Sequence, residues 1–373
     1  MNHNPDIIIV GGGLAGLTAA LDLSQKGYAT LLIEKKTFPH HKVCGEFISN
    51  EVLPYFNRLG IDLDTLHPTH ISHTTISLAN GKSLSAELPL GGFGVSRYTL
   101  DYFLYQKALG SGCKVLCDKV TDITFQEDTF LITTEKEQQL TSKVVLAAYG
   151  KRSNLDRSLQ RGFIQKKSPW LGVKAHYTGS FPNDLVALHN FQGGYCGVSK
   201  VEDDLINICY LARFEVFKKH KNIEDFNVGV LYKNPELKAV LSASNMVFDK
   251  PISISQISFE NKDQIEDHML MLGDAAGLIH PLCGNGMAMA IHSAKLASEQ
   301  VDAFLQGTID RTMLEKNYQS HWNQHFKSRL AMGKRLSKIL LNPFWSAFLF
   351  RLLLLFPGIL PQIIKRTHGN PIA

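Results

Sequence analysis

The sequence predicts a mixed α/β chain, α+β overall, in which a Rossmann-like domain is interrupted by an antiparallel β-sheet and followed by a C-terminal helical segment. Three observations predict it: a glycine-rich turn between a strand and a helix near the N-terminus, alternating polar and apolar residues in the middle, and a second strand, turn and helix after residue 262. With 373 residues and 44% hydrophobic content, the chain can bury a large core across two intertwined domains.

The first 35 residues form a predicted βαβ unit. Residues 6–10 (DIIIV) are a short apolar run, residues 17–27 (LTAALDLSQKG) are helical and end at a glycine, and residues 29–35 (ATLLIEK) are a second buried strand. The first turn, residues 11–16 (GGGLAG), has the G-x-G-x-x-G spacing of dinucleotide-binding turns, in the position that such a turn requires. The unit therefore predicts a nucleotide-binding edge.

Each residue type in this unit has a physical reason. Gly11, Gly13 and Gly16 let the backbone approach a pyrophosphate at the helix N-terminus, where free N–H groups favour an anion. Glu34 ends the second strand and can accept hydrogen bonds from a ribose diol, which argues against the 2′-phosphate of NADP. The unit fits the adenosine half of NAD or of FAD, and the motif does not choose between them.

The middle of the chain is predicted to be mainly antiparallel sheet. In residues 70–88, polar and apolar residues alternate on both sides of Asn80-Gly81, a pair favoured in two-residue hairpin turns. Residues 97–112 form a helix that ends at glycines, and β-type segments between residues 170 and 258 predict an inserted sheet that can wall a cavity.

The strand, turn and helix pattern returns at residues 268–305, so the first domain is discontinuous. The predicted limits are residues 1–70, 97–165 and 262–310 for the cofactor-binding domain, 71–96 and 166–261 for the substrate domain, and 311–373 for the C-terminal helical segment.

A second glycine-rich block decides the cofactor. Residues 273–286 (GDAAGLIHPLCGNG) combine Gly-Asp, a proline and Gly-Asn-Gly before a helix. With the N-terminal unit, residues 42–49 (KVCGEFIS) and the R-x-x-L-D of residues 97–101, this block resembles the FAD-dependent oxidoreductases of p-hydroxybenzoate hydroxylase fold, and among them the geranylgeranyl reductase and FixC-like branch. The resemblance covers most of residues 5–300.

The resemblance implies bound FAD, with NADH or NADPH as the electron donor. In the family, the aspartate of the Gly-Asp block binds the ribityl and pyrophosphate part of FAD, and the arginine lies over the cofactor. The Cys-Gly pair lies beside the flavin ring. The predicted cofactor-binding residues are Gly11, Gly13, Ala15, Gly16, Glu34, Lys35, Cys44, Gly45, Arg97, Asp274, Gly284, Asn285 and Gly286.

Cys44 is also the candidate catalytic residue. A free cysteine often fills a core, but Gly45 would allow close backbone approach to a flavin, and the thiol could then donate a proton. In the reductase branch a tyrosine lines the substrate cavity, so Tyr195 is the candidate substrate contact. His280 lies inside the second glycine-rich block, and its role stays open.

Composition argues against several other classes. The histidines show no H-E-x-x-H or paired Cys/His spacing, so no metal site is predicted. Residues 311–373 hold ten Lys and Arg against a single acid, Glu315, but they form no stripe with stacking aromatics, and no nucleic-acid partner is predicted. Without a C-x-x-C pair or a secretory signal pattern, we expect a cytoplasmic protein.

Residues 342–364 (NPFWSAFLFRLLLLFPGILPQII) raise a membrane question. Arg351 interrupts the apolar run, and Pro357 and Pro361 would break its second half. Three interpretations stay open: a spanning helix, contact with a membrane surface or lipid substrate, and packing over the substrate cavity.

The sequence thus predicts an FAD-dependent oxidoreductase that acts on a largely apolar small molecule such as an isoprenoid, a lipid or a polyketide. Two chemistries stay open: hydride transfer to a carbon–carbon double bond, and monooxygenation, in which reduced flavin traps oxygen and delivers a hydroxyl group. Halogenation is a third, less favoured one, because the sequence contains no W-x-W-x-I-P stretch. The alternative from another class is a non-catalytic flavin-binding electron carrier or sensor.

Overall fold

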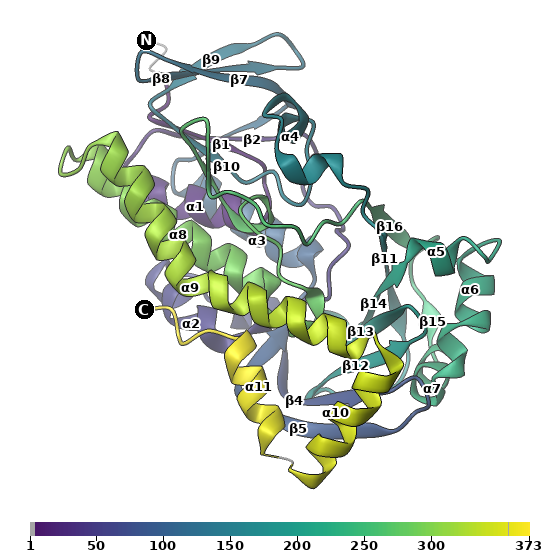
Figure 1. The fold of residues 1–373 in the computed structure, drawn as a ribbon. Helices are drawn as coiled ribbons and strands as arrows, with labels where there is room; N and C mark the ends of the chain where they lie inside the picture. The colour runs from purple at the N-terminus through teal and green to yellow at the C-terminus, as the bar shows by residue number, and fades with distance from the viewer. Residues whose placement is uncertain (1–3, 357) are drawn as a thin grey trace.

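The computed structural model describes residues 4–356 and 358–373, so Pro357, one of the two predicted helix breakers, lies outside the described residues. Figure 1 shows sheets at the centre and at one end of the molecule, with long helices crossing one side of it. The predicted fold class is confirmed, with a Rossmann-like part, a large inserted sheet and a C-terminal helical region.

One sheet carries the predicted nucleotide-binding edge. The elements of this part are β1 (Ile7–Val10), α1 (Leu14–Gln25), β2 (Thr30–Glu34), α3 (Arg97–Gly110), β6 (Lys114–Cys117), β10 (Val144–Ala147), β17 (Ile265–Glu266), β18 (Met269–Met271) and α8 (Gly286–Leu305). The six strands run in the order β17-β18-β10-β1-β2-β6 and are parallel except for β17. All of β1 is buried and α1 packs against both α3 and α8, which explains the continuous apolar runs in these elements.

A larger sheet forms the inserted part. Its strands are β3 (Phe47–Ser49), β4 (Thr69–Ser77), β5 (Ser83–Gly94), β11 (Trp170–Thr178), β12 (Leu185–Phe191), β13 (Gly194–Lys200), β14 (Ile206–Arg213), β15 (Asn245–Met246) and β16 (Ile252–Ser255). The order is β15-β11-β14-β13-β12-β4-β5-β3, with β16 also on β11, and only β12 and β4 pair in parallel. β3 falls within the limits predicted for the cofactor-binding domain, yet it pairs with β5 in this sheet. The other domain limits stay a prediction.

The predicted hairpin between β4 and β5 forms, but the two-residue turn predicted at Asn80-Gly81 is wrong. The N–H of Leu78 donates to the carbonyl oxygen of Lys82 and the N–H of Gly81 donates to that of Leu78, both at 2.9 Å, so the turn consists of residues 79–81. A Cβ at Gly81 would lie 2.9 Å from the ring of Pro235 in α7 (Pro235–Ser242), and Gly81 has a φ of +83°. Both the positive φ of Gly81 in this three-residue turn and its close packing on α7 therefore favour glycine here.

Several short elements complete the two parts. They are α2 (Leu53–Arg58), β7 (Val120–Gln126), β8 (Thr129–Thr134), β9 (Gln139–Ser142), α4 (Leu155–Ser158), α5 (Phe214–Phe217) and α6 (Ile223–Gly229). β7, β8 and β9 form a separate three-stranded antiparallel sheet. Helices α5, α6 and α7 were not predicted, although Asn222 and Asn234 cap α6 and α7 by accepting hydrogen bonds from backbone N–H groups.

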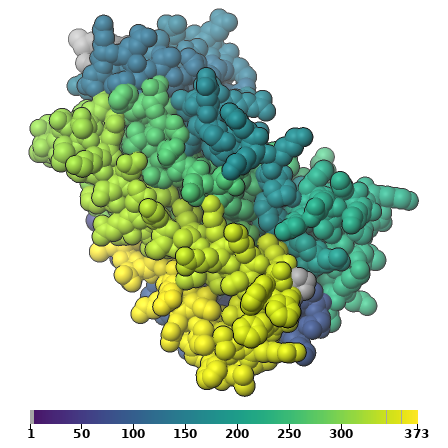
Figure 2. Space-filling model, in the orientation of Figure 1, coloured from purple at the N-terminus to yellow at the C-terminus, as the bar shows by residue number. Residues whose placement is uncertain are grey.

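The C-terminal segment forms α9 (Arg311–Leu340), α10 (Pro343–Leu355) and α11 (Ile359–Thr367). α9 crosses the face shown in Figure 1, and α10 and α11 cover the lower end of the molecule, which is yellow and lime in Figure 2. Pro361 does not interrupt a helix as predicted, because it lies in the first turn of α11, where its missing N–H is tolerated. Among the described residues, no single helix is long and apolar enough to cross a membrane. Only α9 and residues 344–355 taken together reach that length and hydropathy, and these two segments are bent by 105° relative to each other.

Candidate active site

A cavity of about 900 Å³ lies where the two large sheets and the C-terminal helices meet. The carboxyl ends of parallel strands share one edge of a sheet, so the turns after β1, β2 and β18 converge there. The predicted cofactor-binding residues that line the cavity are Gly11, Gly13, Ala15, Glu34, Lys35, Cys44, Gly45, Arg97, Asp274, Gly284 and Gly286. Two other predicted residues, Gly16 and Asn285, lie outside its lining.

The glycine-rich turn is closed on its protein side and open on its cavity side. A Cβ at Gly16 would lie 2.0 Å from the carbonyl oxygen of Gly11, so packing of α1 on β1 requires glycine there. A Cβ at Gly13 would meet only the Arg97 guanidinium, at 3.9 Å, and one at Gly45 would meet nothing within 4 Å. The first N–H groups of α1 have no side-chain cap, so this cradle fits the pyrophosphate of FAD.

Glu34 is oriented by backbone donors at the end of β2. Its Oε2 accepts a hydrogen bond from the N–H of Gly12 at 2.6 Å, and its Oε1 accepts one from the N–H of Lys36 at 3.0 Å. Each carboxylate oxygen keeps a further lone pair. The carboxylate is therefore pre-positioned at the cavity wall to accept hydrogen bonds from ribose hydroxyls.

Arg97 is held at the cavity wall by two charged neighbours. Its Nε and Nη2 donate to the two oxygens of Asp101 at 2.7 and 2.8 Å, and Lys42 Nζ donates to the same carboxylate at 2.8 Å. Burial would raise the pKa of Asp101, but the charges of Arg97 and Lys42 outweigh it and hold that pKa below its ordinary value. The guanidinium therefore keeps one position and a permanent charge beside the open backbone of the glycine turn.

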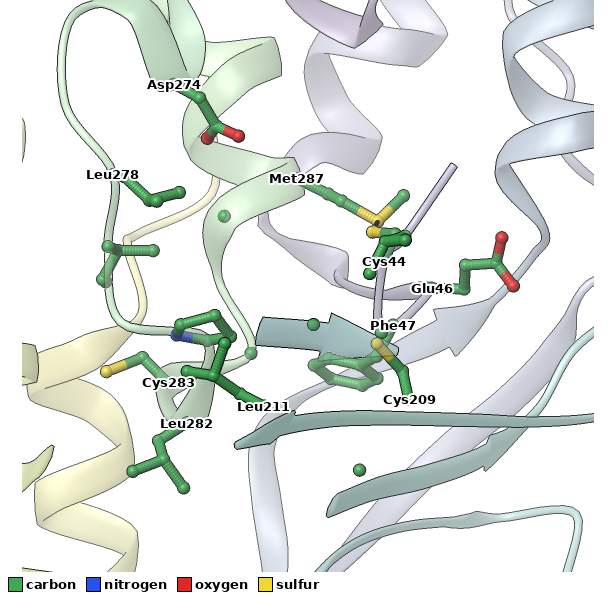
Figure 3. A pocket seen from close by; sticks show the side chains of 18 of the residues that line it. Cys44, Glu46, Phe47, Cys209, Leu211, Asp274, Leu278, Leu282, Cys283 and Met287 are labelled. Carbon is green, nitrogen blue, oxygen red and sulfur yellow. Dashed lines mark hydrogen bonds between the residues drawn. The ribbon is translucent and has the colours of Figure 1, made fainter. Parts of the chain in front are cut away.

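Cys44 lines the cavity. Its Sγ is 3.2 Å from Sδ of Met287 on α8, and Asn207 Nδ2 donates to the carbonyl oxygens of Cys44 and Gly45 at 3.2 and 2.8 Å. Figure 3 shows Cys44 and Met287 together, with Cys209 on the neighbouring strand. Burial raises the pKa of Cys209 to about 12, so that thiol holds its proton tightly.

A buried charged cluster behind Cys44 was not predicted. Glu46 is fully buried, and its oxygens bind Lys174 Nζ at 2.5 Å and His176 Nε2 at 2.7 Å. Burial would raise the pKa of Glu46, but the hydrogen bond from His176 and the charge of Lys174 outweigh it, so the pKa lies below its ordinary value. In Figure 3 the Glu46 carboxylate points away from Cys44. The sequence pattern that could have predicted this cluster is the spacing of Lys174 and His176, which are two residues apart and so lie on one face of a largely apolar strand.

The second glycine-rich block forms the opposite wall. Asp274 points into the cavity in Figure 3, and its carbonyl oxygen accepts a hydrogen bond from Lys262 Nζ at 2.7 Å. Gly284 has a φ of +62°, a conformation that favours glycine. Asn285 does not cap α8: its Oδ1 accepts from Arg329 Nη1 at 3.4 Å instead, and its Nδ2 donates to Glu51 Oε1 at 3.2 Å. The N-terminal N–H groups of α8 therefore keep a partial positive charge near the cavity.

Glu51 also holds the end of the chain. It is fully buried, its carboxylate accepts a hydrogen bond from the N–H of Gly369, and its carbonyl oxygen accepts one from the N–H of Ile372 at 2.7 Å. Arg329 Nη1 lies 3.4 Å from the same carboxylate. The C-terminal residues are thus fastened to the segment that follows β3, and they keep α11 against the cavity.

The far end of the cavity is apolar. Tyr195, the candidate substrate contact, lines it and is 4% exposed, and burial raises the pKa of its phenol well above the ordinary value. The apolar side chains around this end are Leu188, Leu211, Leu278, Leu282, Leu340, Leu349, Phe350, Leu353, Leu360, Ile363 and Ile364. The cavity therefore joins a polar, glycine-rich half to a long apolar half.

His280 lies behind the apolar end, outside the cavity lining. Its ring packs against Phe259 at 4.6 Å between centroids and against Tyr195 at 5.8 Å. Burial lowers the pKa of His280 to about 4, and its Nε2 has no hydrogen-bond partner in the described part of the chain. The ring is therefore neutral at physiological pH and acts as part of an aromatic cluster.

Known proteins resemble this chain over most of its length. The model of the pyridine nucleotide-disulphide oxidoreductase family matches residues 5–159. Digeranylgeranylglycerophospholipid reductase 2 of Methanothermobacter thermautotrophicus is 25% identical over 358 residues, which cover 90% of this chain and 87% of the reductase.

Two solved structures show the same fold. The flavin-dependent brominase Bmp2 has a TM-score of 0.79 at 20% identity and covers 98% of this chain and 93% of its own. PqsL of Pseudomonas aeruginosa, described as "a probable FAD-dependent monooxygenase", has a TM-score of 0.74 at 17% identity and covers 94% of this chain and 100% of its own.

The site and these relatives define the class of protein: the chain is an FAD-dependent oxidoreductase. Among such enzymes it is related to geranylgeranyl reductases and shares its fold with flavin-dependent halogenases and monooxygenases, so the resemblance recognised in the sequence is confirmed. The individual cofactor contacts, the electron donor and the substrate stay predictions.

Proposed function

We propose that this enzyme reduces carbon–carbon double bonds in a long, apolar isoprenoid lipid, with FAD as cofactor and NADH or NADPH as electron donor. The observation that carries the proposal is a single cavity whose lining combines the predicted cofactor cradle, Cys44 and a large set of apolar side chains. The archaeal reductase, 25% identical over 90% of this chain, supports the same substrate class.

Different residues around the cavity would have different roles in such a reaction. When bound and reduced by the nicotinamide donor, FAD would supply a hydride for one carbon of the double bond. The glycine turn and the uncapped start of α1 would hold its pyrophosphate, and Glu34 and Arg97 would orient it. The thiol of Cys44 would supply the proton that the second carbon requires, which completes the addition of two hydrogen atoms. The apolar side chains would bind the isoprenoid and exclude water.

Anaerobic turnover tests this proposal. The purified protein is loaded with FAD, reduced without oxygen and mixed with a digeranylgeranylglycerophospholipid in detergent. We expect the yellow spectrum of oxidised flavin to return and the lipid mass to rise by two hydrogen atoms for each reduced bond. If the lipid gains an oxygen atom in aerated buffer and no hydrogen without air, the enzyme is a monooxygenase and the proposal is wrong.

Two cysteine variants test whether Cys44 is the proton donor. Cys44→Ala should keep its bound FAD but lose most turnover, because general acid catalysis contributes roughly 100-fold or more. Cys209→Ala is the matched control, since Cys209 lines the same cavity with a thiol that burial keeps protonated. Equal turnover in the two variants would remove Cys44 from the catalytic role.

A further inference from the structure

The last helices form a cavity wall on one side and an apolar surface on the other. On α10, Phe350 and Leu353 face inward, are 3% and 4% exposed, and line the cavity. The outer stripe of the same helix contains Phe344, Phe348 and Leu355, which are 71%, 57% and 74% exposed. These outer residues are spaced four and seven apart, so they share one face. A helix that is apolar on both faces needs an apolar partner on its outer face as well.

The surface around this outer stripe is basic. No Asp or Glu follows Glu315 in the sequence. From residue 335 to the end of α11, the exposed basic side chains are Arg335, Lys338, Arg351, Lys365 and Arg366. None of these five is ion-paired with another residue in the parts of the chain that the structure describes. Free positive charges around an apolar stripe are complementary to an anionic lipid surface, whose headgroups lie above acyl chains.

We propose that α10 and α11 rest on the surface of an anionic lipid bilayer, and that the lipid substrate reaches the cavity between these two helices. Leu360 of α11 is 3% exposed and, with Ile363 and Ile364, lines the cavity behind the same surface. A lipid that leaves the bilayer here passes from acyl chains to apolar side chains without crossing water, which avoids the free energy of hydrating its tails. The substrate class rests on the proposed function, whereas bilayer binding is measured without turnover.

Vesicle flotation of the FAD-bound protein tests the contact. Vesicles of phosphatidylcholine alone are compared with an equal mixture of phosphatidylcholine and phosphatidylglycerol. We expect binding to the mixture that weakens as salt is added. Replacing Lys365 and Arg366 together by glutamine should weaken it about 25-fold, at roughly fivefold for each charge. Phe348→Ser should weaken it about tenfold, because one exposed aromatic ring no longer inserts.

Phe214→Ser is the matched control for the aromatic variant. Phe214 is 50% exposed on α5, apart from α10 and α11 (Figure 1), so its loss should leave flotation unchanged. Failure of the wild-type protein to bind anionic vesicles would overturn the proposal, and so would an equal loss in Phe348→Ser and Phe214→Ser. Vesicle binding without turnover of the isoprenoid lipid would instead contradict only the proposed function.

Trp345 provides a readout at the surface itself. It is 53% exposed on α10, whereas Trp322, one of the other two tryptophans, is buried. We expect its fluorescence to shift to shorter wavelength with the mixed vesicles, and the shift to disappear in Trp345→Phe while flotation persists. A shift that depends on protein concentration without vesicles would identify a second copy of the chain as the partner of the stripe and would overturn the proposal.

Discussion

Replacing Glu46 by glutamine should destabilise the protein strongly, because it removes the counter-charge of a fully buried lysine. Lys174 Nζ lies 2.5 Å from Glu46, and neither side chain is exposed. Glutamine keeps the shape and still accepts the hydrogen bond from the N–H of Arg97, so the main change is in charge. Breaking a buried pair in this way costs about 3 to 5 kcal/mol of unfolding free energy.

A double variant tests whether the loss of stability comes from the unpaired charge of Lys174 or from the loss of Glu46 itself. Glu46→Gln combined with Lys174→Met leaves no unpaired buried charge, so it should recover most of the lost stability. The assay is urea unfolding at neutral pH, followed by circular dichroism, with the FAD content of each variant measured beside it. A shift of the midpoint without a change of slope would show that stability alone has changed.

The exposed pair Lys166–Glu260 is a matched control. Its N–O distance is 2.8 Å, but the side chains are 68% and 48% exposed. Glu260→Gln should therefore change the unfolding free energy by less than about 1 kcal/mol, because solvent screens exposed pairs. If Glu46→Gln costs no more than Glu260→Gln, or if the double variant is the least stable protein, then Glu46 does not act as the buried counter-ion.

Other predictions concern packing, pH and cavity length. Gly16→Ala should lower the unfolding free energy of the FAD-free protein by about 1 to 3 kcal/mol, since its Cβ meets a backbone carbonyl, whereas Gly13→Ala should keep that stability and lose FAD affinity in a flavin titration. The pKa of His280 is about 4 in the folded protein and about 6.5 in the unfolded chain, so the unfolded chain binds the proton at a higher pH. As the pH falls from 6.5 to 4, the unfolding free energy of the wild type should therefore drop by about 3 kcal/mol more than that of His280→Phe, as measured by urea unfolding. Gly197→Leu should raise KM for long isoprenoids more than for short ones, because the Cβ space at Gly197 opens into the cavity.

The sequence predicts those parts of the site that depend on local motifs. Gly11 and Asp274 lie far apart in the chain, yet both line the cavity because each follows a parallel strand of the same sheet. The pairing of Glu46 with Lys174 and His176 depends on how β11 packs against the turn before β3, and no local pattern specifies this arrangement. The turn near Gly81 differs from the prediction by one residue, because the backbone hydrogen bonds place Ala79 and Asn80 at its centre instead of Asn80 and Gly81.

The fastening of the C-terminal residues to Glu51 has a consequence for the order in which the molecule is completed. The glycine-rich turn that is predicted to hold the cofactor lies at residues 11–16, whereas α11 begins only at Ile359, so the turn is synthesised long before the helix. A growing chain therefore possesses its nucleotide-binding turn long before it possesses the wall of its apolar chamber. The chamber can close only after α11 has been made, so a protein truncated before residue 359 would carry an open, exposed apolar interior.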